Sequence, residues 1–318
     1  IACASGQSAL LAILTALCRS GDEVIAARHV FGGTVGLLNR FNLQFGIGVR
    51  WADAHDPEAL AALVTPRTRA ILVEAVINPT GDVVDLAALS RVAWEARVPL
   101  VVDSTLATPA LLRIIVDSGR SDWIDGRFPT ISQPFADYDG IEVLKKYPGW
   151  PFAAACRLIA MRELGPCLAP TTAFLLLTGC ETLPLRMRRH SENALALHRF
   201  LKDHPAVEAV SHPGLPDHPR HNLAAALMPS GLGSVQTVTL KGGIAAARRV
   251  TSRLRLFSHL VNVGEARSLV AHPATTTPRN VDPATRAHLG IGDGTLRLSV
   301  GIEEIDDLIA DWEQALAG

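Results

Sequence analysis

Residues 70–103, AILVEAVINPTGDVVDLAALSRVAWEARVPLVVD, contain two short apolar runs on either side of a helical pattern. Ala70–Glu74 and Leu100–Asp103 are each typical of a buried strand, and Leu86–Arg97 has the spacing of an amphipathic helix. A helix between two strands favours parallel pairing, because a parallel connection must cross over the sheet. This stretch therefore predicts a β-α-β unit.

The same alternation extends back to the start of the chain. The expected elements are strands over Glu23–Ala27 and Ile47–Ala52 and helices over Gln7–Arg19, Leu37–Phe45 and Pro57–Val64. Repetition of the unit predicts an α/β fold around a mainly parallel sheet.

The chain beyond Asp103 has a different pattern. A strand-like run, Ile114–Asp117, follows Arg113 with no turn residue between them, and residues 121–151 are irregular. The remaining expected elements are helices over Ala153–Leu164, Thr171–Leu201, Ile244–Leu254 and Glu303–Ala317 and strands over Ser234–Leu240 and Thr295–Val300. We therefore predict a large domain over residues 1–194 and a smaller C-terminal α+β domain over residues 195–318.

Charge and cysteine content narrow the functional classes. The 30 Lys and Arg residues nearly balance the 31 Asp and Glu residues, which argues against a nucleic-acid or membrane partner. Five cysteines without a C-x-x-C pair favour neither a disulfide framework nor a metal site, so we expect a reducing, cytoplasmic setting. Only four lysines occur, and they are Lys145, Lys146, Lys202 and Lys241.

Several polar or aromatic residues follow the expected strands of the first half, where open α/β sheets bind ligands. Ser5-Gly6-Gln7 opens the first helix, where it either holds a phosphate or forms an ordinary N-cap. Asp103 is either a local cap or the partner of a protonated pyridine nitrogen. Asn78 before Pro79 is a common turn former, and Phe31 beside two glycines is either an exposed aromatic face or a packed side chain.

Three candidates lie near the C-terminus. Arg297, within a strand pattern, can bind a carboxylate or simply face solvent. Ser268 is equally open, and His272 before Pro273 can be a core histidine.

The order of these residues resembles the cystathionine γ-synthase-like pyridoxal-phosphate enzymes of Cys/Met metabolism, over essentially the whole chain. The stretches that carry the resemblance include Ala4–Ser8, Phe31–Thr34, Glu74–Pro79, Val101–Thr105, Thr108–Pro109, Phe174–His190, Phe257–Pro273 and Arg297–Glu303. Ser121–Ile141 is similar to an insertion of the sulfhydrylase branch and favours that branch over the γ-lyases.

The resemblance implies a fold and a reaction. The fold would be the pyridoxal-phosphate transferase type I fold, which is aspartate aminotransferase-like. The reaction would be a γ-replacement in which O-acetylhomoserine and sulfide or methanethiol give homocysteine or methionine. The expected assembly is a homotetramer built as a dimer of dimers. Cystathionine γ-synthase and methionine γ-lyase activities on the same scaffold stay open as alternatives.

The resemblance also implies residue roles. Gly6 and Gln7, with Ser5, would bind the cofactor phosphate, and Phe31 would stack on the pyridine ring. The other cofactor residues would be Asp103 at the ring nitrogen, Asn78 near the ring hydroxyl, and Thr105. The substrate would be held by Asn78, Ser268 and Arg297.

The chain departs from the family at its central residue. The family's Schiff-base lysine follows the Asp103 strand, and the resemblance places its segment between Arg113 and Ile114, where this chain has none. A Tyr-x-Arg pair of the family's N-terminal region is also missing, and Phe31 stands where the family usually has tyrosine. We expect either a cofactor-free form that lacks disordered active-site segments or a non-catalytic paralogue.

Overall fold

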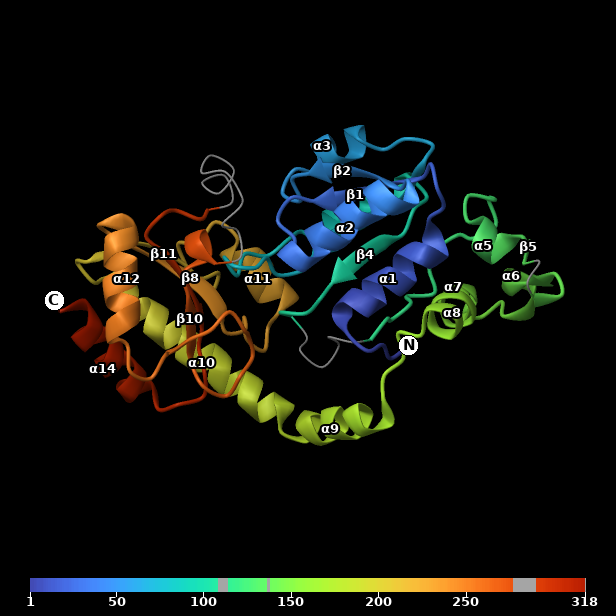
Figure 1. The fold of residues 1–318 in the computed structure, drawn as a ribbon. Helices are drawn as coiled ribbons and strands as arrows, with labels where there is room; N and C mark the ends of the chain where they lie inside the picture. Colours follow the sequence, from blue (N-terminus) through green and yellow to red (C-terminus); the bar gives the residue numbers. More distant parts are fainter. Residues whose placement is uncertain (108–113, 136–137, 277–289, 318) are drawn as a thin grey trace. The chain divides into compact units, whose positions relative to one another are not determined.

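Figure 1 shows the fold in a computed structural model of the chain. The structure describes residues 1–107, 114–135, 138–276 and 290–317. These residues form two compact units, one of Ile1–Ala75 and Val84–Thr178 and the other of Val76–Val83 and Gly179–Gly318. The division falls at residue 178, ahead of the boundary after residue 194 that the sequence suggested, and Val76–Val83 joins the second unit.

The first unit is built on a four-stranded sheet in which every described pairing is parallel. Its strand order is β2 (Gly48–Ala52), β1 (Glu23–Ala27), β3 (Thr68–Glu74) and β4 (Leu100–Asp103). All five side chains of β1 are buried, as expected of a central strand between parallel neighbours. The predicted parallel sheet is therefore confirmed.

Helices alternate with these strands as predicted. They are α1 (Gly6–Leu17), α2 (Gly32–Phe45), α3 (Pro57–Ala62) and α4 (Leu86–Glu95). Asp56 and Asp85 cap α3 and α4 by accepting from the N–H groups of Ala59 and Ala88. Helix α2 begins five residues before the predicted Leu37, because the two glycines that suggested a turn lie in its first turn.

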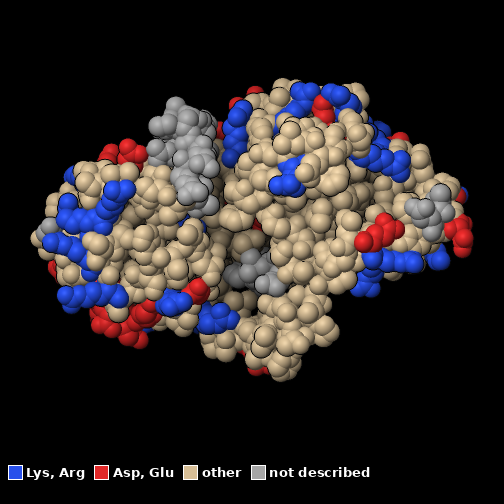
Figure 2. Space-filling view, in the orientation of Figure 1, with Lys and Arg blue, Asp and Glu red and all other residues tan. Residues whose placement is uncertain are grey.

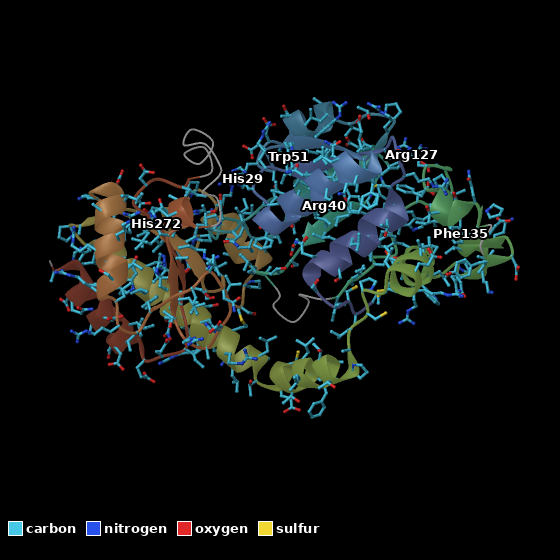
Figure 3. The ribbon with its side chains drawn as sticks, in the orientation of Figure 1. His29, Arg40, Trp51, Arg127, Phe135 and His272 are labelled. Atoms are coloured by element: carbon cyan, nitrogen blue, oxygen red, sulfur yellow. The ribbon has the colours of Figure 1, made fainter. Side chains whose placement is uncertain are left out.

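The rest of the first unit packs around aromatic side chains. Its elements are α5 (Pro129–Ser132), β5 (Pro134–Phe135), β6 (Ile141–Glu142), α6 (Val143–Lys146), α7 (Pro151–Ala155), the π-helical turn η3 (Cys156–Met161) and α8 (Arg162–Leu164). Trp123 stacks on Phe152 with ring centroids 5.5 Å apart, and Arg127, labelled in Figure 3, donates to the Ala96 carbonyl at 2.6 Å. The strand expected over Ile114–Asp117 was wrong: Ile114 forms one isolated bridge, to Ala2. Thr108–Arg113, including the predicted helix start at Thr108–Pro109, lies outside the described residues.

The single long helix predicted over Thr171–Leu201 is two helices. Helix α9 (Pro170–Glu181) ends before Thr182, and α10 (Leu183–Lys202) begins after it. Pro184 lies in the first turn of α10, where its missing N–H and its ring prevent a continuous helix. None of the described helices is both long and apolar enough to span a bilayer.

The second unit contains a five-stranded mixed sheet. Its order is β7 (Val207–Ser211), β8 (Val235–Leu240), β11 (Thr295–Ser299), β10 (Leu269–Ala271) and β9 (Ser258–His259). The helices are α10, α11 (His221–Leu227), α12 (Gly243–Arg253) and α14 (Ile305–Leu316). The core includes Trp312, which meets Phe257 edge to face. This agrees with the α+β character predicted for this part of the chain.

Charged side chains of both signs are interspersed on the face that Figure 2 shows. Some of the described ion pairs are local, such as Lys145 with Glu142 and Arg267 with Glu265, and others join segments distant in the chain. A denser group surrounds the buried Glu23, whose carboxylate binds Arg50, Arg67 and the Thr65 hydroxyl. The hydrogen bond from Arg50 lowers the pKa of Glu23, so this group stays ionised at neutral pH.

Candidate functional site

Phe31, Glu74 and Asp103 lie at the carboxyl-end edge of the parallel sheet formed by β1, β3 and β4. Asp103 ends β4 in register with Glu74 at the end of β3. The chain leaving β1 returns to this edge, since the Phe31 N–H donates to Glu74 Oε1 at 2.5 Å. The edge where open α/β sheets bind ligands therefore carries an acid, an aromatic ring and a helix N-terminus.

Phe31 offers an aromatic face rather than a packed side chain. Its side chain is 44% exposed although its backbone is fixed by Glu74. A Cβ placed on Gly33 would lie 2.5 Å from the Phe31 ring and 3.0 Å from Gln7 Nε2. Glycine at position 33 therefore leaves room for the side chains of Phe31 and Gln7 to come together.

The N-terminus of α1 supports the N-cap interpretation of Ser5. The Ser5 hydroxyl accepts from the Ser8 N–H at 3.0 Å and contacts the Ser8 hydroxyl at 2.8 Å. Gly6 and Gln7 occupy the first turn, where backbone N–H groups have no acceptor within the helix. Ser5 shapes the turn, and Gly6 and Gln7 present the N–H groups that can face an anion.

Asp103 is oriented by its own turn. Both the Thr105 N–H, at 3.0 Å, and the Thr105 hydroxyl, at 2.5 Å, donate to Asp103 Oδ1. Within the described parts of the chain, no donor reaches Oδ2. Thr105 therefore fixes the carboxylate through Oδ1 and leaves Oδ2 able to accept a hydrogen bond from a protonated ring nitrogen.

Arg297 is a buried cation of the second unit. The strand β11 buries it to 5% exposure, so the solvent-facing alternative is wrong. Nη1 lies 3.4 Å from Asn78 Oδ1, and Nη2 donates to the Asn262 carbonyl at 2.9 Å. Nε has no partner and no carboxylate pairs with the guanidinium among the residues the structure describes. Burial lowers the pKa of Arg297, and a buried guanidinium without a counter-ion favours binding of an anion.

Ser268 and His272 have structural partners. The Ser268 hydroxyl donates to Glu303 Oε2 at 2.9 Å and accepts from the Gly301 N–H at 2.8 Å. His272 bridges Thr275 Oγ1 and the Asp293 carbonyl, at 2.9 and 2.8 Å, as a buried histidine (Figure 3). The substrate role of Ser268 stays a prediction.

Sequence reasoning missed Asn262. It lies in the loop between β9 and β10, inside the quoted stretch Phe257–Pro273, and its carbonyl binds Arg297. Its side chain donates to Glu265 at 2.8 Å, which orients the residue. Nothing in the local pattern distinguishes this asparagine from an ordinary turn residue, because the contact joins residues 35 positions apart in the chain.

The four lysines are engaged elsewhere. Lys145 pairs with Glu142, Lys202 pairs with Asp217, and Lys241 donates to the Pro205 carbonyl. Lys146 lies over the Tyr147 ring, 6.0 Å from its centroid. The residues present therefore fit a phosphate, an aromatic ring and its nitrogen, and they do not supply a lysine amine to the cofactor.

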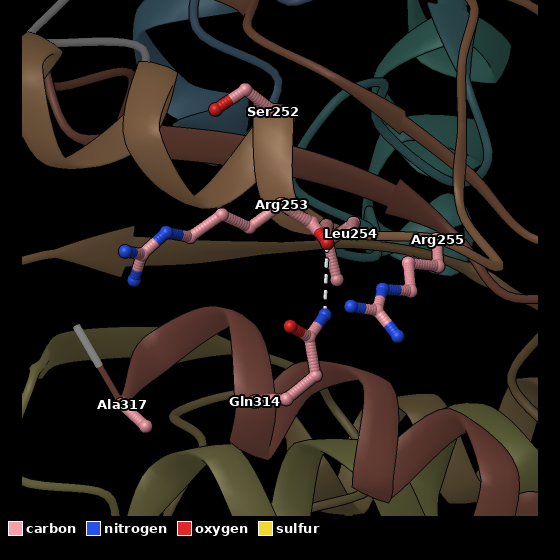
Figure 4. Close-up of a pocket in the computed structure, with 6 residues that line it drawn as sticks. All are labelled: Ser252, Arg253, Leu254, Arg255, Gln314 and Ala317. Atoms are coloured by element: carbon pink, nitrogen blue, oxygen red, sulfur yellow. Dashed lines mark hydrogen bonds between the residues drawn. The ribbon is translucent and has the colours of Figure 1, made fainter.

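One open cavity of about 540 Å³ lies elsewhere, between α12 and α14 (Figure 4). It is lined by Ser252, Arg253, Leu254, Arg255, Gln314 and Ala317. Gln314 Nε2 donates to the Arg253 carbonyl across it at 2.8 Å. None of the predicted site residues lines it, and we assign it no role. No cluster of metal-ligating side chains was found in the described ranges.

The family model for Cys/Met metabolism PLP-dependent enzymes matches residues 1–317. The chain belongs to this family. Membership confirms the predicted α/β type I fold.

Individual members of the family are similar over nearly the full chain. An O-acetyl-L-homoserine sulfhydrylase from Leptospira meyeri is 36% identical, with 99% of this chain and 79% of the relative covered. An O-succinylhomoserine sulfhydrylase from Pseudomonas aeruginosa is 39% identical, with 100% of this chain and 77% of the relative covered.

The solved structures include a protein described as an O-acetylhomoserine (thiol)-lyase from Campylobacter jejuni. It matches with a TM-score of 0.93 at 29% identity, over 100% of this chain and 82% of that one. That protein carries N'-pyridoxyl-lysine-5'-monophosphate.

Proposed function

We propose that this family member is a pyridoxal-phosphate-dependent sulfhydrylase, which converts O-acetyl-L-homoserine and sulfide to L-homocysteine and acetate in methionine biosynthesis. The proposal is supported by the position of Phe31, Gly33 and Asp103 at the carboxyl-end edge of the parallel sheet. It is supported also by an alignment with sulfhydrylases over almost the whole chain. Pyridoxal phosphate, when bound, supplies the electron sink that lets a proton leave the substrate and acetate leave its γ-carbon.

The residues of the first unit bind and orient the cofactor. The N–H groups of Gly6 and Gln7 hold the phosphate at the positive end of α1. Phe31 stacks on the ring. Asp103 Oδ2 keeps a proton on the ring nitrogen, while Thr105 holds the carboxylate in place through Oδ1. Phenylalanine keeps the stacking face that tyrosine would provide but cannot carry a proton.

The second unit holds the substrate carboxylate. Arg297 can make a paired hydrogen bond to a carboxylate through Nε and one Nη. Asn78 Oδ1 and the Asn262 carbonyl accept from Nη1 and Nη2 and so fix the guanidinium, while each Nη keeps a second hydrogen for a ligand. A bound carboxylate neutralises Arg297 and so offsets the cost of burying its charge. This position therefore favours an amino-acid substrate, which has a carboxylate, over a neutral thiol.

The lysine of the proposed enzyme must come from residues beyond the 318 of this chain. The alignment with the Leptospira relative runs over 351 residues, so that relative carries further residues inside the matched span. We propose that a segment between Arg113 and Ile114 supplies the lysine, and that the 318-residue chain alone is inactive.

The test is a product assay on the protein purified from its own source. We expect homocysteine from O-acetylhomoserine and sulfide. Faster reaction with O-succinylhomoserine would mean that the substrate carries a succinyl group instead of an acetyl group. Cystathionine formed with cysteine would indicate a cystathionine γ-synthase, and methanethiol formed from methionine would indicate a γ-lyase. No turnover of any of these would overturn the enzymatic proposal.

The absent lysine favours one second candidate, a non-catalytic paralogue. Such a protein would bind pyridoxal phosphate without turnover and would associate with catalytic subunits. For the enzyme we propose a homotetramer in the cytoplasm. Light scattering of the purified protein tests the assembly.

A further inference from the structure

Two cysteines of the first unit lie directly opposite each other on neighbouring extended segments. Cys3 and Cys167 form an isolated antiparallel bridge, and the Ala4 N–H donates to the Pro166 carbonyl at 2.8 Å beside it. The hydrogen bond joins the neighbours of the two cysteines and not the cysteines themselves, so Cys3 and Cys167 form the kind of antiparallel pair that is called non-hydrogen-bonded. In such pairs the Cα atoms lie about 4.5 Å apart and the side chains point to the same side. That separation is within the range of natural disulfides.

The thiols themselves converge on one residue. Cys3 Sγ lies 3.9 Å from Met161 Sδ, and Cys167 Sγ lies 3.5 Å from the Met161 carbonyl. All five cysteines are free thiols in the structure, and the other three differ in setting. Cys18 and Cys156 are buried and have pKa values of about 12, because burial disfavours their thiolates, whereas Cys180 is exposed on α9.

We propose that Cys3 and Cys167 form a reversible disulfide under oxidising conditions. The oxidant is a peroxide. The exposed Cys167 thiolate attacks a peroxide oxygen, an S–O bond forms, the O–O bond breaks, and the departing hydroxide takes a proton to become water. Cys3 then attacks the Cys167 sulfur, the S–S bond forms, the S–O bond breaks, and a second water leaves with the Cys3 proton.

The order of attack follows from accessibility. Cys3 is fully buried and burial raises the pKa of its thiol, whereas Cys167 is exposed and open to the peroxide. Cys167 leaves α8 through Gly165, in the left-handed region at φ 72°, which brings it beside the first residues of the chain.

The disulfide would act on the turn that opens α1. Cys3 is two residues before the Ser5 N-cap, so the linkage would tie the phosphate-binding turn to the segment after α8. This consequence rests on the proposed function, whereas the linkage itself does not. The closed loop would span most of the first unit, which predicts higher thermal stability for the oxidised form.

The experiment treats the full-length protein, without cofactor or substrate, with hydrogen peroxide and maps its peptides by mass spectrometry. We expect a loss of two hydrogen atoms, a peptide linking Cys3 to Cys167, a melting temperature raised by several degrees, and reversal by dithiothreitol.

Two variants sharpen the result. Cys167→Ser, at an exposed position, should abolish both the linkage and the stabilisation, whereas the matched exposed control Cys180→Ser should keep both. A Cys3–Cys156 linkage, or oxidation of Cys180 with Cys167 left unlinked, would overturn the proposal.

Discussion

Arg297 shows how one buried side chain points to a substrate group. Its strand neighbours Leu296 and Leu298 are fully buried on the opposite face, and its Nε has no partner among the described residues. The alternation of the strand predicted that Arg297 lies on the same face as Ser299, opposite Leu296 and Leu298. It did not predict that this face is buried, because burial depends on contacts from distant segments.

The first prediction concerns this guanidinium. Arg297→Lys keeps the charge but loses the paired geometry, so the dissociation constant for O-acetylhomoserine should rise about 10- to 100-fold. Calorimetric titration of the cofactor-loaded protein measures it. Arg267→Lys, an exposed arginine bound to Glu265, is the matched control and should change nothing. Equal affinities for wild type and Arg297→Lys would remove Arg297 from the substrate site.

The second prediction concerns the ring-nitrogen carboxylate. Asp103→Asn keeps an oxygen for Thr105 but loses the negative charge, so pyridoxal-phosphate affinity should fall about tenfold or more while the fold is retained. Fluorescence titration with the cofactor measures this. Asp53→Asn is the control, because Asp53 follows β2 and likewise accepts from the N–H two residues later. A similar loss in both variants would contradict the assignment.

The third prediction concerns Gly33. An alanine there would overlap the Phe31 ring and contact Gln7, so Gly33→Ala should displace the stacking face and weaken cofactor binding several-fold. The helix itself should gain slightly from alanine. Gly36→Ala on the same helix is the control, since a Cβ there meets nothing within 4 Å. Unchanged affinity in Gly33→Ala would show that Phe31 does not contact the ring.

At the scale of elements, the sequence predicted the parallel sheet of the first unit and its helices, but it described residues 121–151 as irregular, where α5, β5, β6 and α6 lie. The strands over Glu23–Ala27 and Leu100–Asp103 were predicted at their observed bounds, since continuous apolar runs between helical patterns are typical of parallel sheets. All of β1 is buried, whereas β4, last in the described strand order, has one buried residue. The short strands β7, β9 and β10 were missed. Strands β9 and β10 have two and three residues, which carry too little periodicity to be found alone, and the five residues of β7 are defined by pairing with β8 more than 20 residues later.

The fourth prediction belongs to the junction of α12 and α14. Asp311 is buried on α14, and its carboxylate accepts from the backbone N–H groups of Arg255 and Leu256 at 2.9 Å each. Asp311→Ala would leave both donors unsatisfied and should lower the free energy of unfolding by about 3 kcal/mol. Urea unfolding measures it. Glu313→Ala, exposed on the same helix, should have little effect, and equal losses in both would contradict the argument.

At the scale of the whole molecule, two buried histidines make stability depend on pH. His198 on α10 and His212 after β7 have ring centroids 5.1 Å apart. Burial lowers the pKa of His198 to about 4 and that of His212 to about 2, where the neighbouring His198 adds to the effect. Both rings therefore stay neutral in the folded protein at pH values where the unfolded chain takes up protons.

The fifth prediction follows from that difference. The folded pKa values lie below the unfolded value of about 6.5, so each histidine makes its full contribution to the free energy of unfolding above pH 6.5. As the pH drops below 6.5, that free energy decreases by about 1.4 kcal/mol per pH unit for each histidine. For His198 the fall ends near pH 4. Guanidinium unfolding at several pH values measures the slope.

A matched pair of variants isolates His198. His198→Gln should reduce the slope by up to one proton, since glutamine can still donate to the Ala194 carbonyl but does not titrate. His259→Gln, at an exposed position of β9, should leave the slope unchanged. A slope in His198→Gln equal to wild type would assign the acid sensitivity to other groups.

The central claim is that the protein is a pyridoxal-phosphate enzyme whose lysine lies outside these 318 residues. The direct measurement is to take the protein from its own source with cofactor, reduce it with borohydride, and determine its intact mass and the labelled peptide. We predict a mass above 33.9 kDa and one pyridoxyl-lysine, in a segment between Arg113 and Ile114. A mass of 33.9 kDa with no labelled lysine would contradict the enzymatic account and leave the non-catalytic paralogue.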